Sequence, residues 1–174
     1  ELVFENCRIP ASNLLLEAGR MRELLGVLDA DRITGNPPVC LGVAQAAFEN
    51  IVRHVKDRQQ FGKPLADNQG LQWKLADMAM DIEAARALLY RAAQRVDEGN
   101  PSIVDTSITK AFVNQMAVRV TNEAMQLAGA CGLSEDYPYE RYFRDVRGMS
   151  IGYGTVEIHK SSIAREVLSG RYTH

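Results

Sequence analysis

The spacing of apolar residues through the middle of the chain is helical. Two series of apolar side chains recur every three or four residues, which places each series on one face of an α-helix. The first series is Leu71, Leu75, Met78, Ile82, Ala85 and Leu89. The second is Ile108, Phe112, Met116, Val120, Ala124 and Leu127. Because Gly99-Asn100-Pro101 separates them, they predict one helix from Asp67 or Asn68 to about Glu98, and another from about Ser102 to Ala130.

Helical periodicity also occurs on both sides of this central pair. A segment from about Arg20 to Arg58 is interrupted by Gly35, Pro37 and Pro38, where we expect a kink or a restart. A short helix is expected from about Tyr139 to Val146, and a last one from about Thr155 to Ser169. Long helices with short connections become antiparallel neighbours, so the predicted fold is an all-α, up-down helical bundle.

The first ten residues have a different pattern. From Glu1 to Pro10 apolar and polar residues alternate as in a strand, and no second strand of comparable quality follows. We therefore interpret this stretch as the remnant of a strand whose sheet lies elsewhere. The expected organisation is the end of a preceding β-domain in residues 1–15 and a helical-bundle domain in residues 16–174, together forming the tail of a longer protein.

Composition narrows the function classes only modestly. The 174 residues are 46% hydrophobic and 24% charged, as in an ordinary globular protein. A formal net charge of -2 offers no electrostatic reason to expect nucleic acid, and no apolar run is long enough to span a membrane. The three cysteines are far apart in the sequence and odd in number, so we do not expect a disulfide framework. We expect them to be buried thiols instead. The histidines lack metal-ligand spacing, so no zinc site is expected.

Two motifs have the residue types that a phosphate-containing cofactor needs. The first is Asp57-Arg58-Gln59-Gln60-Phe61-Gly62-Lys63-Pro64-Leu65. Its guanidinium suits phosphate oxygens through forked, charge-assisted hydrogen bonds, although basic residues at a helix end also simply balance the helix dipole. The second is Gly152-Tyr153-Gly154-Thr155-Val156-Glu157, where Thr155 is expected to begin a helix. Free N–H groups at a helix start suit an anion or the polar edge of a cofactor.

These two motifs, in this order and at this separation, resemble the C-terminal helical domain of acyl-CoA dehydrogenases. The resemblance covers nearly the whole chain and implies that FAD is the cofactor. It implies that Arg58 contacts the pyrophosphate of the dinucleotide. The other cofactor-binding residues that it implies are Gln60, Phe61, Asn68, Gln69, Gln126, Gly129, Ala130, Thr155 and Glu157. In the family the contact at Gln126 reaches the flavin of a neighbouring subunit, and Ala130 replaces a second glycine there.

One departure from the family concerns the catalytic base. Tyr153 occupies the position where most members have the catalytic glutamate. A minority, including dehydrogenases of branched acyl groups, has the glutamate on an earlier helix within the pattern Leu-Asp-Leu-Glu-Arg. That pattern resembles Leu28-Asp29-Ala30-Asp31-Arg32, which makes Asp31 the candidate base. Aspartate is one methylene shorter than glutamate, so its reach is the main question.

The resemblance also implies a set of substrate contacts. Asp29 and Arg32 are expected to contact the acyl-CoA. Because they are three residues apart, they share a helix face. Alternatively, they could form an exposed ion pair, which would stabilise the protein little. Gly154 is expected to lie against the thioester. Arg165 is expected either to reach the coenzyme A or to form a surface salt bridge.

The activity that the resemblance implies is α,β-dehydrogenation of an acyl-CoA or a related acyl thioester. In the family a carboxylate removes the α proton, the β hydrogen leaves as hydride to the flavin, and electrons pass to an electron-transferring flavoprotein. It further implies a role in fatty acid metabolism, a homodimer or homotetramer, and a cytoplasmic location in a bacterium or the mitochondrial matrix in a eukaryote. Three alternatives stay open: a flavoenzyme of different chemistry, such as carbon–sulfur cleavage or nitroalkane oxidation; a non-catalytic subunit that completes a partner's site; and a plain helical bundle that binds partners.

Overall fold

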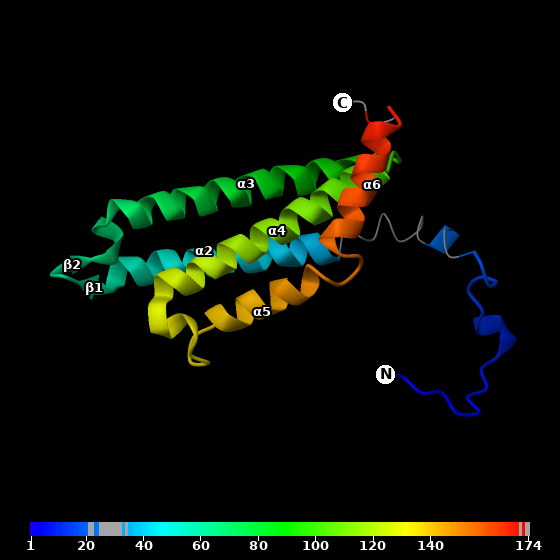
Figure 1. The fold of residues 1–174 in the computed structure, drawn as a ribbon, viewed down its shortest axis with the longest axis horizontal. Helices are drawn as coiled ribbons and strands as arrows, with labels where there is room; N and C mark the ends of the chain where they lie inside the picture. Colours follow the sequence, from blue (N-terminus) through cyan, green and yellow to red (C-terminus); the bar gives the residue numbers. More distant parts are fainter. Residues whose placement is uncertain (21–22, 25–32, 34, 171, 173–174) are drawn as a thin grey trace.

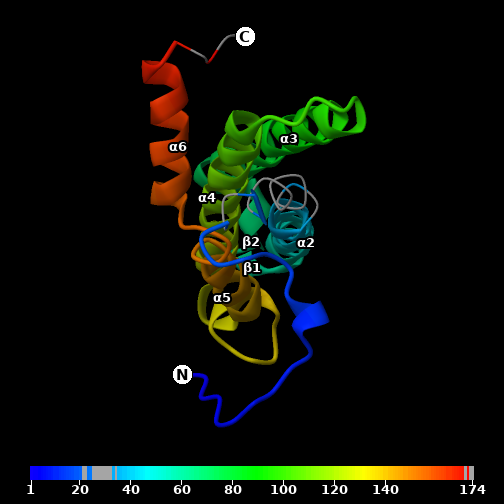
Figure 2. The ribbon, with the colours of Figure 1, turned by 90° about the vertical axis from the view of Figure 1, so that its right-hand side faces the viewer.

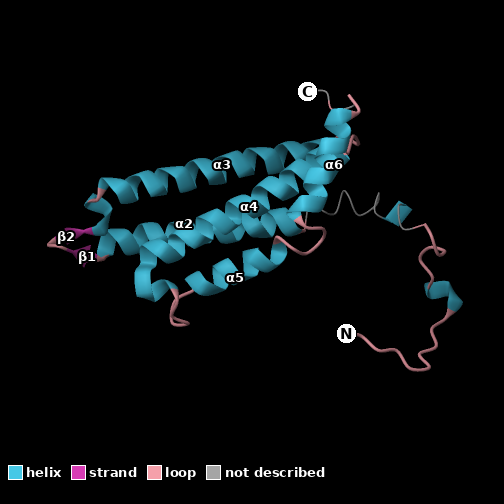
Figure 3. Ribbon diagram, in the orientation of Figure 1, coloured by secondary structure: helices cyan, strands magenta, loops and turns pink. Residues whose placement is uncertain are grey.

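A computed structural model describes residues 1–20, 23–24, 33, 35–170 and 172 of the chain, and within these the architecture is a helical bundle (Figures 1 and 3). Its α-helices are α2 (Asn36–Asp57), α3 (Gln69–Asp97), α4 (Ile103–Ala128), α5 (Tyr139–Met149) and α6 (Val156–Leu168). The short elements are 3-10 helices η1 (Ala11–Asn13), η2 (Leu65–Asp67) and η3 (Gly129–Gly132), and strands β1 (Gln59–Gln60) and β2 (Lys63–Pro64). The predicted all-α bundle is confirmed.

The helix ends follow from the residues that occupy them. Gly35 precedes α2 and proline lies in its first turn, where the missing N–H removes no intrahelical bond. The prolines therefore start this helix and do not kink it. Ser102 caps α4 by accepting a 3.3 Å hydrogen bond from the backbone N–H of Asp105. Most of the helical segment expected between Arg20 and Gly35 lies outside the described residues. Among the ends that can be compared, the largest shift is in α5, which continues to Met149 past the expected end at Val146.

α4 is the central helix of the bundle. It packs against α2, α3, α5 and α6; α2, α3 and α4 run lengthwise beside one another, and α6 lies across one end of α4 (Figures 1 and 2). Ion pairs between α3 and α4 confirm an antiparallel arrangement, because residue numbers rise on one helix as they fall on the other. These pairs are Lys74–Glu123, Asp81–Arg119 and Arg95–Asp105.

The core matches the predicted faces, but it is broader on α4. The residues buried as predicted are Met78, Ile82, Ala85 and Leu89 on α3, and Met116, Val120, Ala124 and Leu127 on α4. Leu71 and Leu75 of α3, and Ile108 and Phe112 of α4, are half-buried. Because four helices surround α4, it also buries polar side chains, among them Ser107, Lys110 and Asn114. A single apolar stripe was therefore an incomplete description of this helix.

Three local features differ from the expectations. Residues 1–10 form no strand and are exposed, since a strand needs a partner to satisfy its backbone groups. The domain boundary at residue 15 stays a prediction. The loop after α2 contains an antiparallel hairpin, β1–β2, that was not predicted. None of the three cysteines forms a disulfide; Cys40 is buried as expected, whereas Cys7 is exposed and Cys131 is half-buried.

None of the helices in the described ranges is long and apolar enough to cross a membrane.

Candidate functional site

The hairpin after α2 presents a strained aromatic residue. Gln59 pairs with Pro64 and Gln60 with Lys63, which leaves a two-residue turn of Phe61 and Gly62. Both turn residues have positive φ, 53° and 77°, as a type I′ hairpin turn requires. Glycine adopts this region freely, but a bulky side chain does so at a cost, and the Phe61 ring is 99% exposed. Strain of this kind, held at an exposed position, is typical of binding sites.

The backbone on both sides of this turn is fixed, while the side chains face outward. The N–H of Arg58 donates to the carbonyl of His54, and the carbonyl of Arg58 accepts from the N–H of Leu65, both at 2.8 Å. The Arg58 side chain is exposed. Asn68, which precedes α3, donates from Nδ2 to the Leu65 carbonyl at 3.1 Å, and Gln69 is exposed in the first turn of α3. The structure therefore gathers Arg58, Gln60, Phe61, Asn68 and Gln69 at one end of the bundle.

The carboxyl end of α4 lies at this same end of the bundle (Figure 1). Gly129 ends the helix at φ 61°, and its N–H donates to the carbonyl of Gln126. Gln126 and Ala130 are exposed. A hydrogen bond with Cys131 raises the pKa of Tyr137 in the loop that follows η3, and the charge of Arg58 opposes that shift. The Arg58 hairpin and the residues around Gln126 therefore lie at the same end of the bundle.

Close packing explains why Gly132, shortly after Gln126 and Ala130, is a glycine. Gly132 is buried, and a Cβ built there would lie 2.4 Å from the backbone oxygen of Met125. Ala130, in contrast, is exposed on η3. Replacement of the family's second glycine by Ala130 therefore meets no packing obstacle in this chain.

The second motif forms the turn between α5 and α6. Tyr153 has φ 58° and its side chain is 76% exposed, while Gly154 has φ 92°. Thr155 caps α6, with its hydroxyl accepting a 3.4 Å hydrogen bond from the N–H of Ile158. Its own backbone N–H and the Thr155 hydroxyl hold the pKa of the exposed Glu157 carboxyl below the ordinary value. An ionised carboxylate at this helix start accepts hydrogen bonds from hydroxyl groups and opposes a second anion, so this end suits a ribose better than a phosphate.

Arg165 is exposed near the carboxyl end of α6. Of the two expected roles, the surface salt bridge is not formed with any partner in the described parts of the chain. Its guanidinium is therefore available to a ligand or to another chain.

The candidate residues fall into two groups at opposite ends of α4. Gly154 contacts α4 at Lys110, whereas the other group surrounds Gln126. Sixteen residues of helix between Lys110 and Gln126 correspond to roughly 24 Å at 1.5 Å per residue. The first group contains the hairpin and the Gln126 motif; the second contains the turn that bears Tyr153, Gly154, Thr155 and Glu157.

A buried polar network beneath the α5–α6 turn was not predicted. The Nζ of Lys110, which is 1% exposed, lies 2.7 Å from the carbonyl oxygen of Gly154 and 3.4 Å from that of Met149. Asn114 donates from Nδ2 to Oδ1 of Asn36 at 2.8 Å, and Asn36 donates from Nδ2 to the Met149 carbonyl at 2.9 Å. The available signal was the three- and four-residue spacing of Ser107, Lys110 and Asn114, which forms a polar stripe on α4.

His159 extends this network from α6. Its ring is 2% exposed, with Nδ1 3.3 Å from the Ser107 hydroxyl and Nε2 3.3 Å from the carbonyl oxygen of Tyr153. Within the ranges that the structure describes, no group of three His, Cys, Asp or Glu side chains could hold a metal ion.

The candidate base and its neighbours are not part of this geometry. Asp29, Asp31 and Arg32 lie outside the described residues, so their roles stay predictions.

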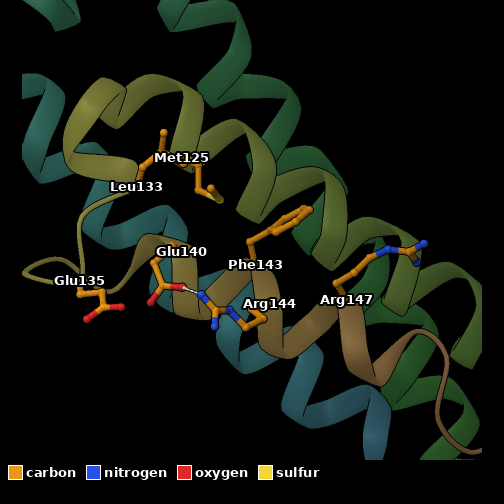
Figure 4. Close-up of a pocket in the computed structure, with 7 residues that line it drawn as sticks. All are labelled: Met125, Leu133, Glu135, Glu140, Phe143, Arg144 and Arg147. Atoms are coloured by element: carbon orange, nitrogen blue, oxygen red, sulfur yellow. Dashed lines mark hydrogen bonds and ion pairs between the residues drawn. The ribbon is translucent and has the colours of Figure 1, made fainter.

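A surface hollow of about 400 Å³ lies between the carboxyl half of α4 and α5 (Figure 4). Phe143 and Met125 form its apolar part, and an ion pair between Glu140 and Arg144 crosses its rim. Its lining is Met125, Leu133, Glu135, Glu140, Phe143, Arg144 and Arg147. None of the predicted site residues is among them, so this hollow is not the candidate site.

Comparison with known proteins agrees with this arrangement. The family model for the acyl-CoA dehydrogenase C-terminal domain matches residues 27–168. The chain belongs to the acyl-CoA dehydrogenase family. It is 44% identical, over 97% of its length and 43% of the relative's, to an acryloyl-CoA reductase (NADH) of Anaerotignum propionicum.

Two solved structures share the fold. Butyryl-CoA dehydrogenase of Megasphaera elsdenii is 42% identical with a TM-score of 0.88, covering 95% of this chain and 43% of that one. A chain in a structure of the electron transferring flavoprotein of Acidaminococcus fermentans is 38% identical with a TM-score of 0.89, covering 95% and 44%. This chain spans less than half the length of these relatives.

Proposed function

We propose that this chain is the flavin- and substrate-binding helical domain of an FAD-dependent acyl-CoA dehydrogenase that acts on an acyl-CoA or a related acyl thioester. The observation that supports this most directly is the pairing of two exposed motifs, the Arg58 hairpin and the α5–α6 turn, on a bundle of this family. A plain partner-binding bundle would not need a strained, exposed Phe61 beside an exposed arginine.

The residues at the hairpin end fit a dinucleotide. The exposed Arg58 guanidinium can hold a pyrophosphate by forked hydrogen bonds, and the Phe61 ring and the Gln60 amide lie beside it on the same hairpin. Gln126, Gly129 and Ala130 add a second contact at this end, and Asn68 and Gln69 a third. At the other end, Thr155 and the Glu157 carboxylate can accept from ribose hydroxyls. When bound, FAD supplies the acceptor for the hydride that leaves the β carbon.

Asp31 is the proposed base that removes the α proton. Tyr153, at the usual position of the base, is a poor base because a phenol has a reference pKa of about 10. Its exposed ring can pack against the acyl chain or donate a hydrogen bond. Asp29 and Arg32 are proposed as acyl-CoA contacts from the same helix, Gly154 as the contact with the thioester and Arg165 as a contact with the coenzyme A moiety.

The separation of the two groups along α4 favours an oligomer. The two clusters lie about 24 Å apart along one helix. This separation favours two flavin sites, in which each flavin contacts the hairpin end of one chain and the α5–α6 turn of another chain. We therefore propose a homodimer or homotetramer in which the hairpin end completes a neighbour's site.

The electron partner and the cellular role are part of the same proposal. An electron-transferring flavoprotein is the proposed acceptor in fatty acid metabolism, in a bacterial cytoplasm or a mitochondrial matrix. The similarity to an acryloyl-CoA reductase (NADH) leaves room for turnover in the reducing direction.

A second candidate function rests on Tyr153. Because the commonest base is absent, the same scaffold could support a different flavin reaction, such as carbon–sulfur cleavage or nitroalkane oxidation, or a non-catalytic subunit that completes a partner's site.

The visible absorption spectrum of the complete protein, recorded before and after anaerobic addition of short and branched acyl-CoAs, tests the proposal. Bleaching of an oxidised flavin band by one thioester is expected and would identify the substrate class. A yellow protein that no thioester bleaches would contradict dehydrogenation and favour the different chemistry. A colourless protein would favour the non-catalytic subunit.

A further inference from the structure

We propose that Lys110 and His159 form a buried clasp that holds the α5–α6 turn in its strained shape, and that Lys110 is thereby a positioning residue for the candidate active site. The structural part of this inference stands on the contacts of this chain alone. Its catalytic consequence rests on the proposed function.

The turn has a shape that its own residues disfavour. Tyr153 and Gly154 follow one another at φ 58° and 92°. Glycine adopts such a conformation readily, whereas an aromatic residue in the left-handed region needs support from its surroundings. Since the Tyr153 side chain is 76% exposed, packing of its ring within the bundle supplies little of that support.

The support comes from the carbonyl side of the same two residues. The Tyr153 carbonyl faces Nε2 of His159 at 3.3 Å, and the Gly154 carbonyl accepts from Nζ of Lys110 at 2.7 Å. Both side chains are buried and start from different helices, α6 and α4. Hydrogen bonds to a charged donor are stronger than neutral ones, and more so away from water.

Lys110 also closes the turn at its other end. The same ammonium lies 3.4 Å from the carbonyl of Met149, the last residue of α5, which Asn36 of α2 also contacts at 2.9 Å. One side chain therefore connects the end of α5 to Gly154, the residue before the cap of α6. The position of Tyr153 relative to α4 is set by these bonds, so loss of the ammonium is expected to release the turn without removing any group that touches a substrate.

Amide hydrogen exchange in the complete protein tests the clasp. Lys110→Met removes the ammonium and keeps a long stem. Thr109→Val is the matched control, because it changes an equally buried side chain of α4 that bonds to Leu88 of α3 and not to the turn. Lys110→Met is expected to speed exchange across residues 150–155 by about 10- to 100-fold, with no change in α2 or α3 and none in Thr109→Val.

Wild-type exchange in residues 150–155 of the Lys110→Met protein would overturn the clasp, as would a rise that extends evenly over the whole bundle. His159→Leu, which releases the other carbonyl, decides the matter in the same way if Lys110→Met does not fold.

Turnover tests the positioning role separately. If the complete protein oxidises an acyl-CoA, Lys110→Met is expected to lower kcat by about 10- to 100-fold, with unchanged FAD content and little change in KM, because a displacement of about 1 Å has effects of that size. Thr109→Val should keep wild-type kcat. Unchanged kcat in Lys110→Met despite faster exchange would overturn positioning. If the wild type oxidises no acyl-CoA, the proposed function fails, and the exchange measurement still decides the clasp.

Discussion

Gly154 lies directly against His159: a Cβ built on Gly154 would be 3.1 Å from Nε2 of the buried imidazole. That distance is tighter than ordinary van der Waals contact, and the glycine has φ 92°, which disfavours any side chain. Two independent restrictions, the backbone conformation and the space beside His159, therefore favour glycine at position 154.

Gly154→Ala is expected to lower the free energy of unfolding by about 1–2 kcal/mol from the conformational term, with a further loss if the imidazole cannot shift. Urea denaturation monitored by circular dichroism measures it. Gly152→Ala is the matched control, because its Cβ would lie 3.8 Å from the Gly148 carbonyl oxygen, an ordinary contact. Equal losses in the two variants would contradict this account of the turn.

Gly132→Ala is expected to be more damaging. Its Cβ would lie 2.4 Å from the Met125 backbone oxygen, and a backbone atom has no rotamer with which to move away. Overpacking of a closed site costs about 1–3 kcal/mol or more. Gly148→Ala, in open space within α5, should instead stabilise the protein by up to about 1 kcal/mol. A thermal melt of both variants checks the opposite signs, and a neutral Gly132→Ala would refute the predicted clash.

Much of the fold was predictable because local sequence determines helix ends. Ser102 and Thr155 have cap side chains, and the structure uses both of them as caps. The β1–β2 hairpin was not predicted because each strand has only two residues, too few for a visible alternation. The only sequence signal for the hairpin was Gly62 directly after Phe61. This pair can be interpreted as a hairpin turn only when the positive φ angles of both residues are known.

The site was predictable only where exposed motif residues determine it. The surface position of Arg58 follows from a helix end beside a glycine–proline turn. Lys110, by contrast, is a lysine in the middle of a helix, and such residues usually face solvent. Its ammonium contacts the backbone carbonyls of Met149 and Gly154, about forty residues away in sequence. The polar stripe of Ser107, Lys110 and Asn114 on α4 signals a polar face but does not identify these partners.

Arg58→Ala is expected to weaken FAD binding by the complete protein about 10- to 100-fold, roughly the value of one hydrogen bond to a charged group. Arg58→Lys should recover only part of this, since an ammonium keeps the charge but not the fork. Lys56→Ala is the control, an exposed cation in the last turn of the same helix. Titration of apoprotein with FAD, followed by flavin fluorescence, measures the series. Equal weakening by Lys56→Ala would mean that the field of the helix end, and not a pyrophosphate contact, is what matters.

Cys40 is expected to make stability fall in alkali. Burial raises its pKa from 9.0 to about 11, and the charge of Lys110 opposes the shift. Below about pH 9 the folded and unfolded chains both keep the thiol proton, so the contribution of Cys40 to the free energy of unfolding is fully present. Above about pH 9 the unfolded chain loses this proton while the folded chain retains it, so the free energy of unfolding decreases as pH rises towards about 11. Urea denaturation at about pH 8 and about pH 10.5 should show a smaller decline for Cys40→Ala than for the wild type. Parallel declines would contradict it.

Asp31 provides the decisive variant pair for the proposed chemistry. Asp31→Asn keeps the size of the side chain and removes its basicity, so the complete protein should keep FAD but lose exchange of the substrate α proton with deuterated solvent. Asp31→Glu restores the methylene that the family's base has, and it should retain exchange, at a rate changed by as much as about 100-fold because a shift of about 1 Å alters a proton-transfer geometry by that amount. Loss of exchange in Asp31→Asn with retention in Asp31→Glu would assign the base. Retained exchange in Asp31→Asn would remove Asp31 from the reaction, and turnover of a different substrate by that variant would favour the alternative chemistry on this scaffold.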